Sequence, residues 1–187
     1  MKTTRWETSL YGLNPWVLSS IAGVITVLQL ALCLFRANPD ALPALRYLGY
    51  VIWGAGAVFG ILPIFTLRGK GGVARGKSYV HTTTLVDSGV YAVVRHPQGG
   101  TAWILLNLGL ILIGQTWPIA ILGIASMVLV YLDALKADQY AIEKFGDDYR
   151  RYMKSVPRFN VVLGIIRWAR RTRQERDSVD DESERIN

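Results

Sequence analysis

The chain has 187 residues, of which 51% are hydrophobic, and a formal net charge of +7. Its apolar residues gather in long uncharged runs, so the composition indicates an integral membrane protein and argues against a soluble domain. The basic surplus then fits loops that face the cytoplasm better than it fits nucleic acid, and the single cysteine, Cys33, excludes an internal disulfide.

Two uncharged runs in the first half of the chain are long enough to cross a bilayer. Residues 15–35 and 47–67 each match the roughly 20 residues that a spanning helix needs. The first run is too long for a signal-peptide core and is predicted to be a retained helix. The glycines of the second run either let a neighbouring helix approach closely or are merely tolerated in lipid. They are Gly49, Gly54, Gly56 and Gly60.

A third uncharged run, residues 97–132, is too long for one span. As a single helix it would measure about 54 Å, against a hydrocarbon core of about 30 Å. The break falls at 115–118, where Thr116 suits an N-cap and Pro118 a first helical turn. The run is therefore predicted to fold into a helical hairpin with spans over 98–114 and 117–134.

The region after the hairpin changes in character. Apolar residues there recur at helical spacing, which predicts one amphipathic helix or two that break at Gly146. Residues 159–172 are apolar on one side and basic at the end, and should lie in the membrane interface. The mixed-charge tail, 173–187, is predicted to be disordered. The apolar positions are Leu135, Ile142, Phe145, Tyr149 and Tyr152.

The whole sequence thus predicts an all-α integral membrane domain over residues 1–172, with four spans and amphipathic C-terminal helices over 135–172. The loop 68–97 is rich in basic residues, whereas the turn 115–118 has no charge. The positive-inside rule therefore predicts that this loop and both termini are cytoplasmic. The two arginines of loop 36–46 weigh mildly against this orientation.

The loop contains a phosphate-loop pattern, GGVARGKS at 71–78. Such a loop binds nucleotides when a buried strand precedes it and a helix follows, so that backbone N–H groups point at the phosphates. Here a membrane span precedes it. A basic loop that faces lipid headgroups is the favoured interpretation.

Arg95, His96 and Pro97 come in direct succession at the start of the third span. The residue before a proline is biased away from helix, and Pro97 suits a first turn. Arg95 and His96 should therefore lie beside the positive end of that helix, where an anion such as a carboxylate is favoured. On spacing alone, an ordinary juxtamembrane anchor is the better interpretation.

Asp138 falls on the predicted buried stripe of the post-membrane helix. Because an unpaired buried carboxylate is costly, we expect a cationic partner: Arg95, His96 or the positive group of a ligand. A structural ion pair or a solvated acid is the alternative, and Asp133 has the same ambiguity. Asn107 and Gln29, inside spans, are better explained by interhelical hydrogen bonds than by ligands.

Two segments resemble a known family. LVDSGVYAVVRHP (85–97) resembles the L-V-x-x-G-x-Y-x-x-x-R-H-P signature of the isoprenylcysteine carboxyl methyltransferase and phospholipid methyltransferase family. FGDDYRRYMKSVPRF (145–159) resembles that family's F-G-x-x-Y-x-x-Y-x-x-x-V-x-R segment. The two motifs keep the family's order on either side of a membrane hairpin, and the resemblance covers roughly residues 80–160.

The resemblance implies S-adenosylmethionine-dependent methyl transfer, at the cytosolic membrane face, to a carboxylate or amine on a lipid or a prenylated molecule. It implies a helical fold without a Rossmann sheet and without a metal. Arg95, His96 and Asp138 match the catalytic positions. The residues that the resemblance assigns to the cofactor are Val86, Gly89, Tyr91, Arg95, His96, Pro97, Asp138 and Tyr149.

The chemistry of the cofactor agrees with this assignment. Its carboxylate suits Arg95 or His96, its ammonium suits Asp138, and its sulfonium suits an aromatic face. An amine acceptor would need a base, and His96 and Asp138 are the candidates for it.

The chain also departs from the family pattern. Ala137 replaces one acid of an acidic pair, Gly99 stands where an aromatic is common, and Thr83 replaces a histidine that is displaced to His81. A non-catalytic membrane binding module is therefore the alternative, followed by an NADPH-dependent membrane reductase of related architecture. The sequence does not identify the acceptor or the oligomeric state.

Overall fold

The computed structural model describes residues 15–72, 76, 78 and 82–186, and over these residues the protein is all-helical. Part of the GGVARGKS pattern, and all of His81, lie outside the described residues. Four of the helices are long and apolar enough to cross a membrane. The elements are α1 (Pro15–Arg36), α2 (Pro43–Lys70), the 3-10 helix η2 (Gly89–Ala92), the π-helix η3 (Pro97–Ala102), α3 (Trp103–Gly114), α4 (Trp117–Ser155) and α5 (Val161–Ile186).

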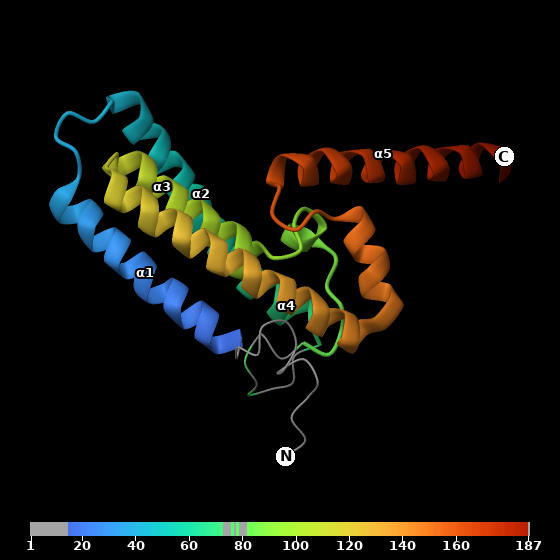
Figure 1. Ribbon diagram of the computed structural model, residues 1–187. Helices are drawn as coiled ribbons and strands as arrows, with labels where there is room; N and C mark the ends of the chain where they lie inside the picture. Colours follow the sequence, from blue (N-terminus) through green and yellow to red (C-terminus); the bar gives the residue numbers. More distant parts are fainter. Residues whose placement is uncertain (1–14, 73–75, 77, 79–81, 187) are drawn as a thin grey trace, which may run out of the picture.

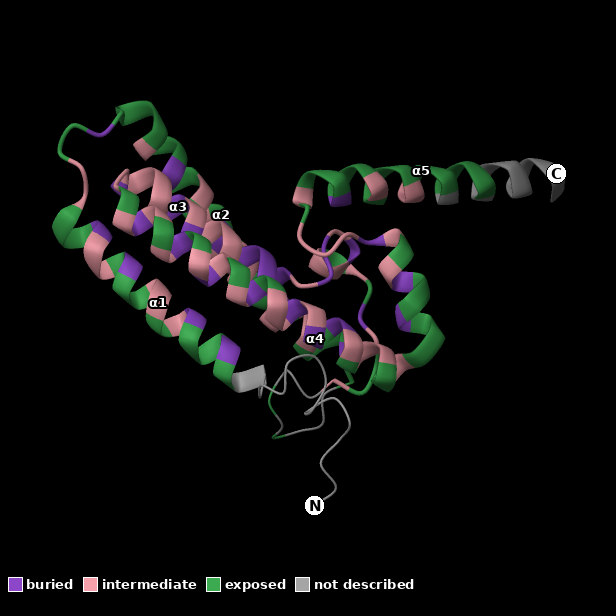
Figure 2. Cartoon of the chain, viewed as in Figure 1, coloured by how far each residue is buried: buried purple, intermediate pink, exposed green. Residues whose placement is uncertain are grey.

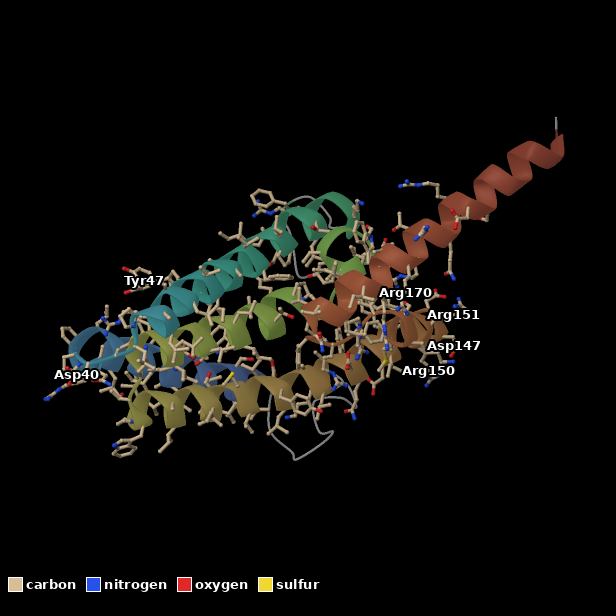
Figure 3. All side chains as sticks on the ribbon, turned by 90° about the horizontal axis from the view of Figure 1, so that it is seen from above. Asp40, Tyr47, Asp147, Arg150, Arg151 and Arg170 are labelled. Carbon is tan, nitrogen blue, oxygen red and sulfur yellow. The ribbon has the colours of Figure 1, made fainter. Side chains whose placement is uncertain are left out.

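The predicted hairpin is the centre of the bundle. α3 and α4 pack together, with α2 along α3 and α1 along α4 (Figure 1). Buried residues face the interior, while large apolar side chains such as Phe35 and Phe65 are exposed on the outside (Figure 2). The charged residues Asp40 and Arg150 lie at opposite ends (Figure 3). This distribution suits a lipid environment, and the protein is a multi-pass helical membrane protein.

Glycines bring α2 and α3 close together. A Cβ atom added to Gly49 would lie 2.9 Å from the carbonyl oxygen of Gly109, and one added to Gly56 would lie 3.0 Å from that of Ala102. By contrast, nothing lies within 4 Å of a Cβ added to Gly54. Of the two explanations for these glycines, close helix approach therefore holds at positions 49 and 56.

Polar side chains tie α1 to the hairpin inside the bundle. Thr26 donates to Oδ1 of Asn107 at 3.1 Å, and its hydroxyl lies 2.9 Å from that of Ser126. Nε2 of Gln29 donates to the carbonyl oxygens of Asn107 and Ile119 at 3.1 and 3.2 Å. The prediction that Asn107 and Gln29 form interhelical hydrogen bonds is confirmed.

The turn of the hairpin is stabilised differently from the prediction. Thr116 precedes α4 but makes no capping hydrogen bond with its side chain. Pro118, in the first turn, has no N–H to offer such a cap, which removes one of its usual donors. Instead Gln115 adopts a left-handed conformation, and its side chain donates to the carbonyl of Leu42 at 3.0 Å and accepts from the N–H of Leu42 at 2.9 Å.

α4 continues well past the predicted end of the fourth span. No proline or glycine lies between positions 134 and 145, so the helix continues past the predicted end of the span. At Gly146, where φ is 59°, two helical segments meet at a kink, which is one of the predicted alternatives. The first segment, residues 117–145, alone measures about 44 Å at 1.5 Å per residue. Because this exceeds the thickness of the hydrocarbon core, the part of α4 after the apolar run to Leu132 lies beyond the membrane.

α5 also extends further than the composition predicts. It runs to Ile186 and so includes residues 173–186, for which the sequence predicts disorder. A basic and an acidic residue stand four apart in this stretch, as Arg173 and Asp177 do. Such pairs support a helix without any apolar contact.

Candidate functional site

The segment before α3 is held by backbone contacts with the segment that follows α4. The N–H of Arg95 donates to the carbonyl of Pro157 at 3.0 Å, and that of His96 to the carbonyl of Arg158 at 3.3 Å. Tyr152 donates its hydroxyl to the carbonyl of Tyr91 at 2.6 Å. Two stretches that lie about 60 positions apart in the sequence therefore form one layer at the end of the bundle.

The local conformations follow from the sequence. Gly89 begins η2 with φ of 62°, a conformation that glycine adopts without strain. His96 is not helical, with φ of −119° and ψ of 68°, and Pro97 begins η3 as predicted. The aromatic ring of Phe159 packs where a side chain on Gly100 would lie, and its centroid is 6.1 Å from that of His96.

Asp138 is the centre of the charged cluster. It is 3% exposed, and His96 Nε2 and the Tyr149 hydroxyl lie 2.7 and 2.6 Å from its Oδ1. On its other oxygen, Oδ2, Nε of Arg158 donates at 2.8 Å. Arg95 Nη1 lies 3.4 Å from Oδ1 as an ion pair. The structure thus brings together Asp138, Arg95 and His96, as the buried stripe predicts.

The environment of Asp138 determines its charge. Burial alone disfavours the carboxylate, but the hydrogen bond and charge of His96, the hydrogen bond from Tyr149 and the charge of Arg95 together outweigh it and hold the pKa of Asp138 well below its usual value. For Tyr149, burial and the hydrogen bond to Asp138 raise the pKa of the phenol. Asp138 is therefore an anion, and Tyr149 a neutral donor to it.

A cavity of about 350 Å³ opens beside this cluster. Its size falls in the range of small-molecule sites. Six of the eight residues predicted for the cofactor line it, whereas Gly89 and Asp138 do not. The six are Val86, Tyr91, Arg95, His96, Pro97 and Tyr149.

Arg95 gives the cavity its chemical character. Arg95 is 9% exposed. Its side-chain atoms Nε and Nη1 are buried and make no hydrogen bond among the described residues. The two arginines of the cluster, Arg95 and Arg158, exceed the single charge of Asp138 even when His96 is neutral. A buried guanidinium that makes no hydrogen bond through two of its nitrogens, in a cluster with a surplus of positive charge, suits an anionic ligand. A carboxylate, which can accept two hydrogen bonds from it, is the natural partner.

The departures from the family pattern also lie at this cavity. Ala137 presents its methyl group to the wall, and Gly99 lines the cavity with nothing within 4 Å of a Cβ built on it. Among the described residues, no Asp or Glu lines it. Asp138 directs both oxygens at protein donors, so its predicted role as a partner of a ligand's ammonium stays a prediction.

Arg158 is the main site residue that the sequence analysis does not single out. The one feature of the sequence that points to Arg158 is its match to the final arginine of the F-G-x-x-Y-x-x-Y-x-x-x-V-x-R segment. Asp133, the other acid considered, accepts a hydrogen bond from Ser19 at 3.0 Å and is not among the residues lining this cavity.

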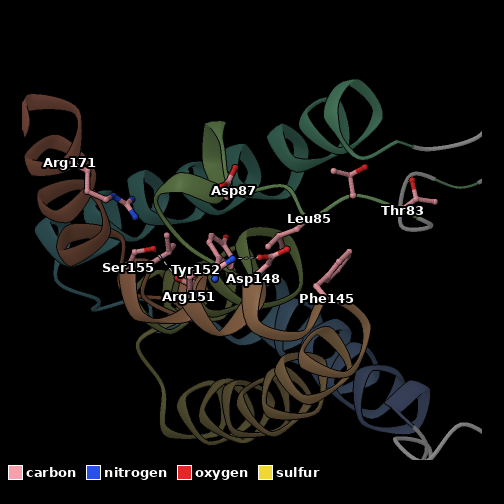
Figure 4. Close-up of a pocket in the computed structure, with 11 residues that line it drawn as sticks. Thr83, Leu85, Asp87, Phe145, Asp148, Arg151, Tyr152, Ser155 and Arg171 are labelled. Carbon is pink, nitrogen blue, oxygen red and sulfur yellow. Dashed lines mark hydrogen bonds and ion pairs between the residues drawn. The ribbon is translucent and has the colours of Figure 1, made fainter. Parts of the chain in front are cut away.

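A second, larger cavity of about 670 Å³ adjoins the first and shares Thr84, Leu85, Phe145 and Tyr152 with it (Figure 4). Both of its arginines already have partners. Arg151 pairs with Asp148, and Arg171 donates to a backbone carbonyl at 2.7 Å. The smaller cavity, lined by the buried guanidinium of Arg95 with two nitrogens that make no hydrogen bond among the described residues, is therefore the better candidate for a binding site.

Comparison with known proteins identifies no relative: no protein-family model, no curated protein and no solved structure matches the chain. The motifs and the geometry of this site are therefore the basis for assigning a function.

Proposed function

We propose that this protein is an S-adenosylmethionine-dependent methyltransferase that acts on a lipophilic acceptor, a lipid or a prenylated molecule, at the cytosolic membrane face. The observation that carries the proposal is the buried guanidinium of Arg95, which lines the 350 Å³ cavity and whose Nε and Nη1 make no hydrogen bond among the described residues. Support also comes from the two sequence motifs, whose residues form this one cavity and cluster.

The residues present fit the cofactor. Arg95 would hold its carboxylate, while Val86, Pro97 and Tyr91 offer an apolar and aromatic lining for the rest of the molecule. S-adenosylmethionine supplies an electrophilic methyl group on a sulfonium. The protein's own task is to align an acceptor with that group and to exclude water.

Within this proposal, Asp138 and His96 act mainly by position. Asp138 holds Arg95, His96 and Arg158 in a fixed arrangement through the contacts described above. A carboxylate acceptor would need no base. For an amine acceptor, His96 is the imidazole at the cavity that would take the proton, with Asp138 orienting its ring.

The basic loop and the C-terminal region support the proposed orientation. Arg68 and Lys70 stand at the end of α2, on the same end of the bundle as the charged end of α4. By the positive-inside rule this end, with the cavity, faces the cytoplasm, as do both termini.

One observation favours a second candidate function. Because no carboxylate of the described residues lines the cavity, the second candidate is a membrane binding module that holds an anionic, lipid-like ligand without transferring a methyl group. The methyltransferase predicts catalytic transfer of methyl groups to an acceptor, whereas the binding module predicts ligand binding without methyl transfer.

The test is incubation of the purified protein with cofactor that carries a labelled methyl group and with a membrane lipid extract. Methyl transfer predicts label in the lipid fraction that depends on active protein, and mass spectrometry then identifies the acceptor. A lipid fraction that stays unlabelled, with cofactor binding intact, would favour the binding module.

A further inference from the structure

The first half of α5 exposes large apolar side chains to its surroundings (Figure 2). Val162 is 70% exposed, Ile165 49%, Ile166 44% and Trp168 46%. Spaced three and four residues apart, Val162, Ile165 and Ile166 lie on one side of the helix, with Trp168 at its edge. We call these four residues the apolar face of α5.

The opposite side of α5 contacts the protein. The carbonyl oxygen of Val93 packs so closely on Gly164 that an added Cβ would lie 2.0 Å from it. Arg171 donates to the carbonyl of Ala92 at 2.7 Å. Because these contacts fix the inner side of the helix, the apolar face points away from the protein.

The charge of this part of α5 indicates what covers the apolar face. From Val161 to Gln174 the helix carries arginines and no acid; the first acid is Glu175. An apolar face flanked by arginines is the pattern of a helix that lies in the headgroup region of anionic membranes. The four candidate spans already place a bilayer beside this molecule, and α5 begins next to the bundle (Figure 1).

We infer that the apolar face of α5 is seated in the headgroup region of the membrane that the bundle spans, with Arg170 and Arg173 against anionic lipids. This inference goes beyond methyl transfer and does not depend on it. Since α5 contacts Ala92 and Val93, just ahead of Arg95, the lipid-bound helix also supports the chain that forms the cavity.

The single cysteine of the chain permits a direct test. In a Cys33→Ala background, a nitroxide label is placed at Ile165→Cys on the apolar face or at Gln174→Cys, half a turn around the helix on the polar side. Each protein is reconstituted in nanodiscs of phosphatidylcholine, with or without phosphatidylglycerol. Accessibility is measured with oxygen, which partitions into lipid, and with a water-soluble nickel chelate.

We expect the label at position 165 to be more accessible to oxygen than the label at position 174, and the label at position 174 to be more accessible to the nickel chelate. The difference between the two labels should be larger when phosphatidylglycerol is present. Equal access of the nickel chelate to both labels in both membranes would overturn the inference. So would spin–spin broadening between Ile165 labels that disappears on dilution with unlabelled protein, because it would show a second copy on this face.

Because Cys33 is buried, Cys33→Ala could destabilise the protein, so a second measurement uses the chain with its native cysteine. Tryptophan fluorescence is compared between the wild type and Trp168→Phe in lipids brominated near the headgroup or deep in the acyl chain. The signal lost on substitution, that of Trp168, should be quenched at least twofold more by shallow bromines. Equal, weak quenching at both depths would contradict the inference.

Discussion

Asp138 sets the geometry of the cavity because its two oxygens receive side chains from both flanks of the hairpin. Arg95 and His96 approach from the segment before α3, and Arg158 from the segment after α4. Tyr149, which follows Asp138 in α4 beyond the kink at Gly146, donates its hydroxyl to Oδ1 of Asp138. A substitution of Asp138 should therefore disturb the positions of Arg95, His96 and Arg158 together.

Asp138→Asn tests this role, since it keeps the shape of the side chain and removes its charge. Arg95 and Arg158 would then face each other without compensation. We expect the free energy of unfolding to fall by about 3 kcal/mol, toward the lower end of values for broken buried pairs because Arg158 keeps 24% of its side chain exposed. Thermal unfolding in detergent measures the change.

Asp147→Asn is the matched control. Its ion pair with Arg150 is exposed, and loss of such a pair changes stability by less than about 1 kcal/mol. Equal effects of the two substitutions would show that Asp138 does not hold the cluster together.

The pH dependence of stability follows from the lowered pKa of Asp138. A carboxylate whose pKa is lower in the folded protein stabilises it fully above the unfolded value of about 4, and this contribution is lost as the pH falls toward the folded value. The difference in thermal unfolding midpoint between the wild type and Asp138→Asn should therefore become smaller below about pH 4. A constant difference between pH 7 and 3 would refute this assignment.

Much of this cluster can be predicted from the sequence, but not all. The apolar stripe of α4 places Asp138 on a buried face, and the cost of a lone carboxylate then predicts Arg95 or His96 as its partner. Arg158 is not predicted, because it lies in a non-helical segment whose path depends on backbone contacts with residues 95 and 96. Nor does the sequence show that protein donors occupy both oxygens of Asp138.

At the scale of the helices, the position of α3 depends on glycine contacts with α2. A Cβ on Gly109 would lie 2.8 Å from that of Trp53 and 2.9 Å from the carbonyl oxygen of Gly49. Without these glycines the two backbones could not approach so closely. The cavity lies at the end of this helix pair, since both Leu67 of α2 and Pro97 line it.

Gly109→Val should separate α2 from α3 and lower the free energy of unfolding by about 1–3 kcal/mol, the usual cost of overpacking. Gly54→Val, on α2 where nothing lies within 4 Å of an added Cβ, is the control and should have little effect. The thermal midpoint in detergent compares the two. A smaller loss in Gly109→Val than in Gly54→Val would contradict the observed packing.

The helices themselves are well predicted, because uncharged runs and prolines mark the spans and the hairpin turn. Their contacts are less predictable. The sequence offers four glycines in α2 as candidates for close packing and does not single out Gly109, since hydropathy carries no information on the register of two helices. The continuation of α4 past position 134 is not predicted, because a change in polarity does not by itself end a helix, whereas the kink at Gly146 is one of the predicted alternatives.

At the scale of the whole molecule, the distribution of basic residues predicts a cytoplasmic cavity and cytoplasmic termini. Green fluorescent protein fused after Asn187 should fluoresce, and alkaline phosphatase at the same position should be inactive. Alkaline phosphatase inserted after Thr116, in the turn at the other end of the bundle, should be active. The opposite pattern would place the cavity outside the cytoplasm and exclude the proposed cofactor.

The central claim is that Arg95 receives the carboxylate of S-adenosylmethionine. Isothermal titration of the purified protein should show saturable binding that Arg95→Met weakens about 10- to 100-fold, the usual worth of a charged hydrogen bond. Arg150→Met, at an exposed pair, should bind like the wild type. Absence of binding to the wild type, or equal affinity of a folded Arg95→Met protein, would contradict the account.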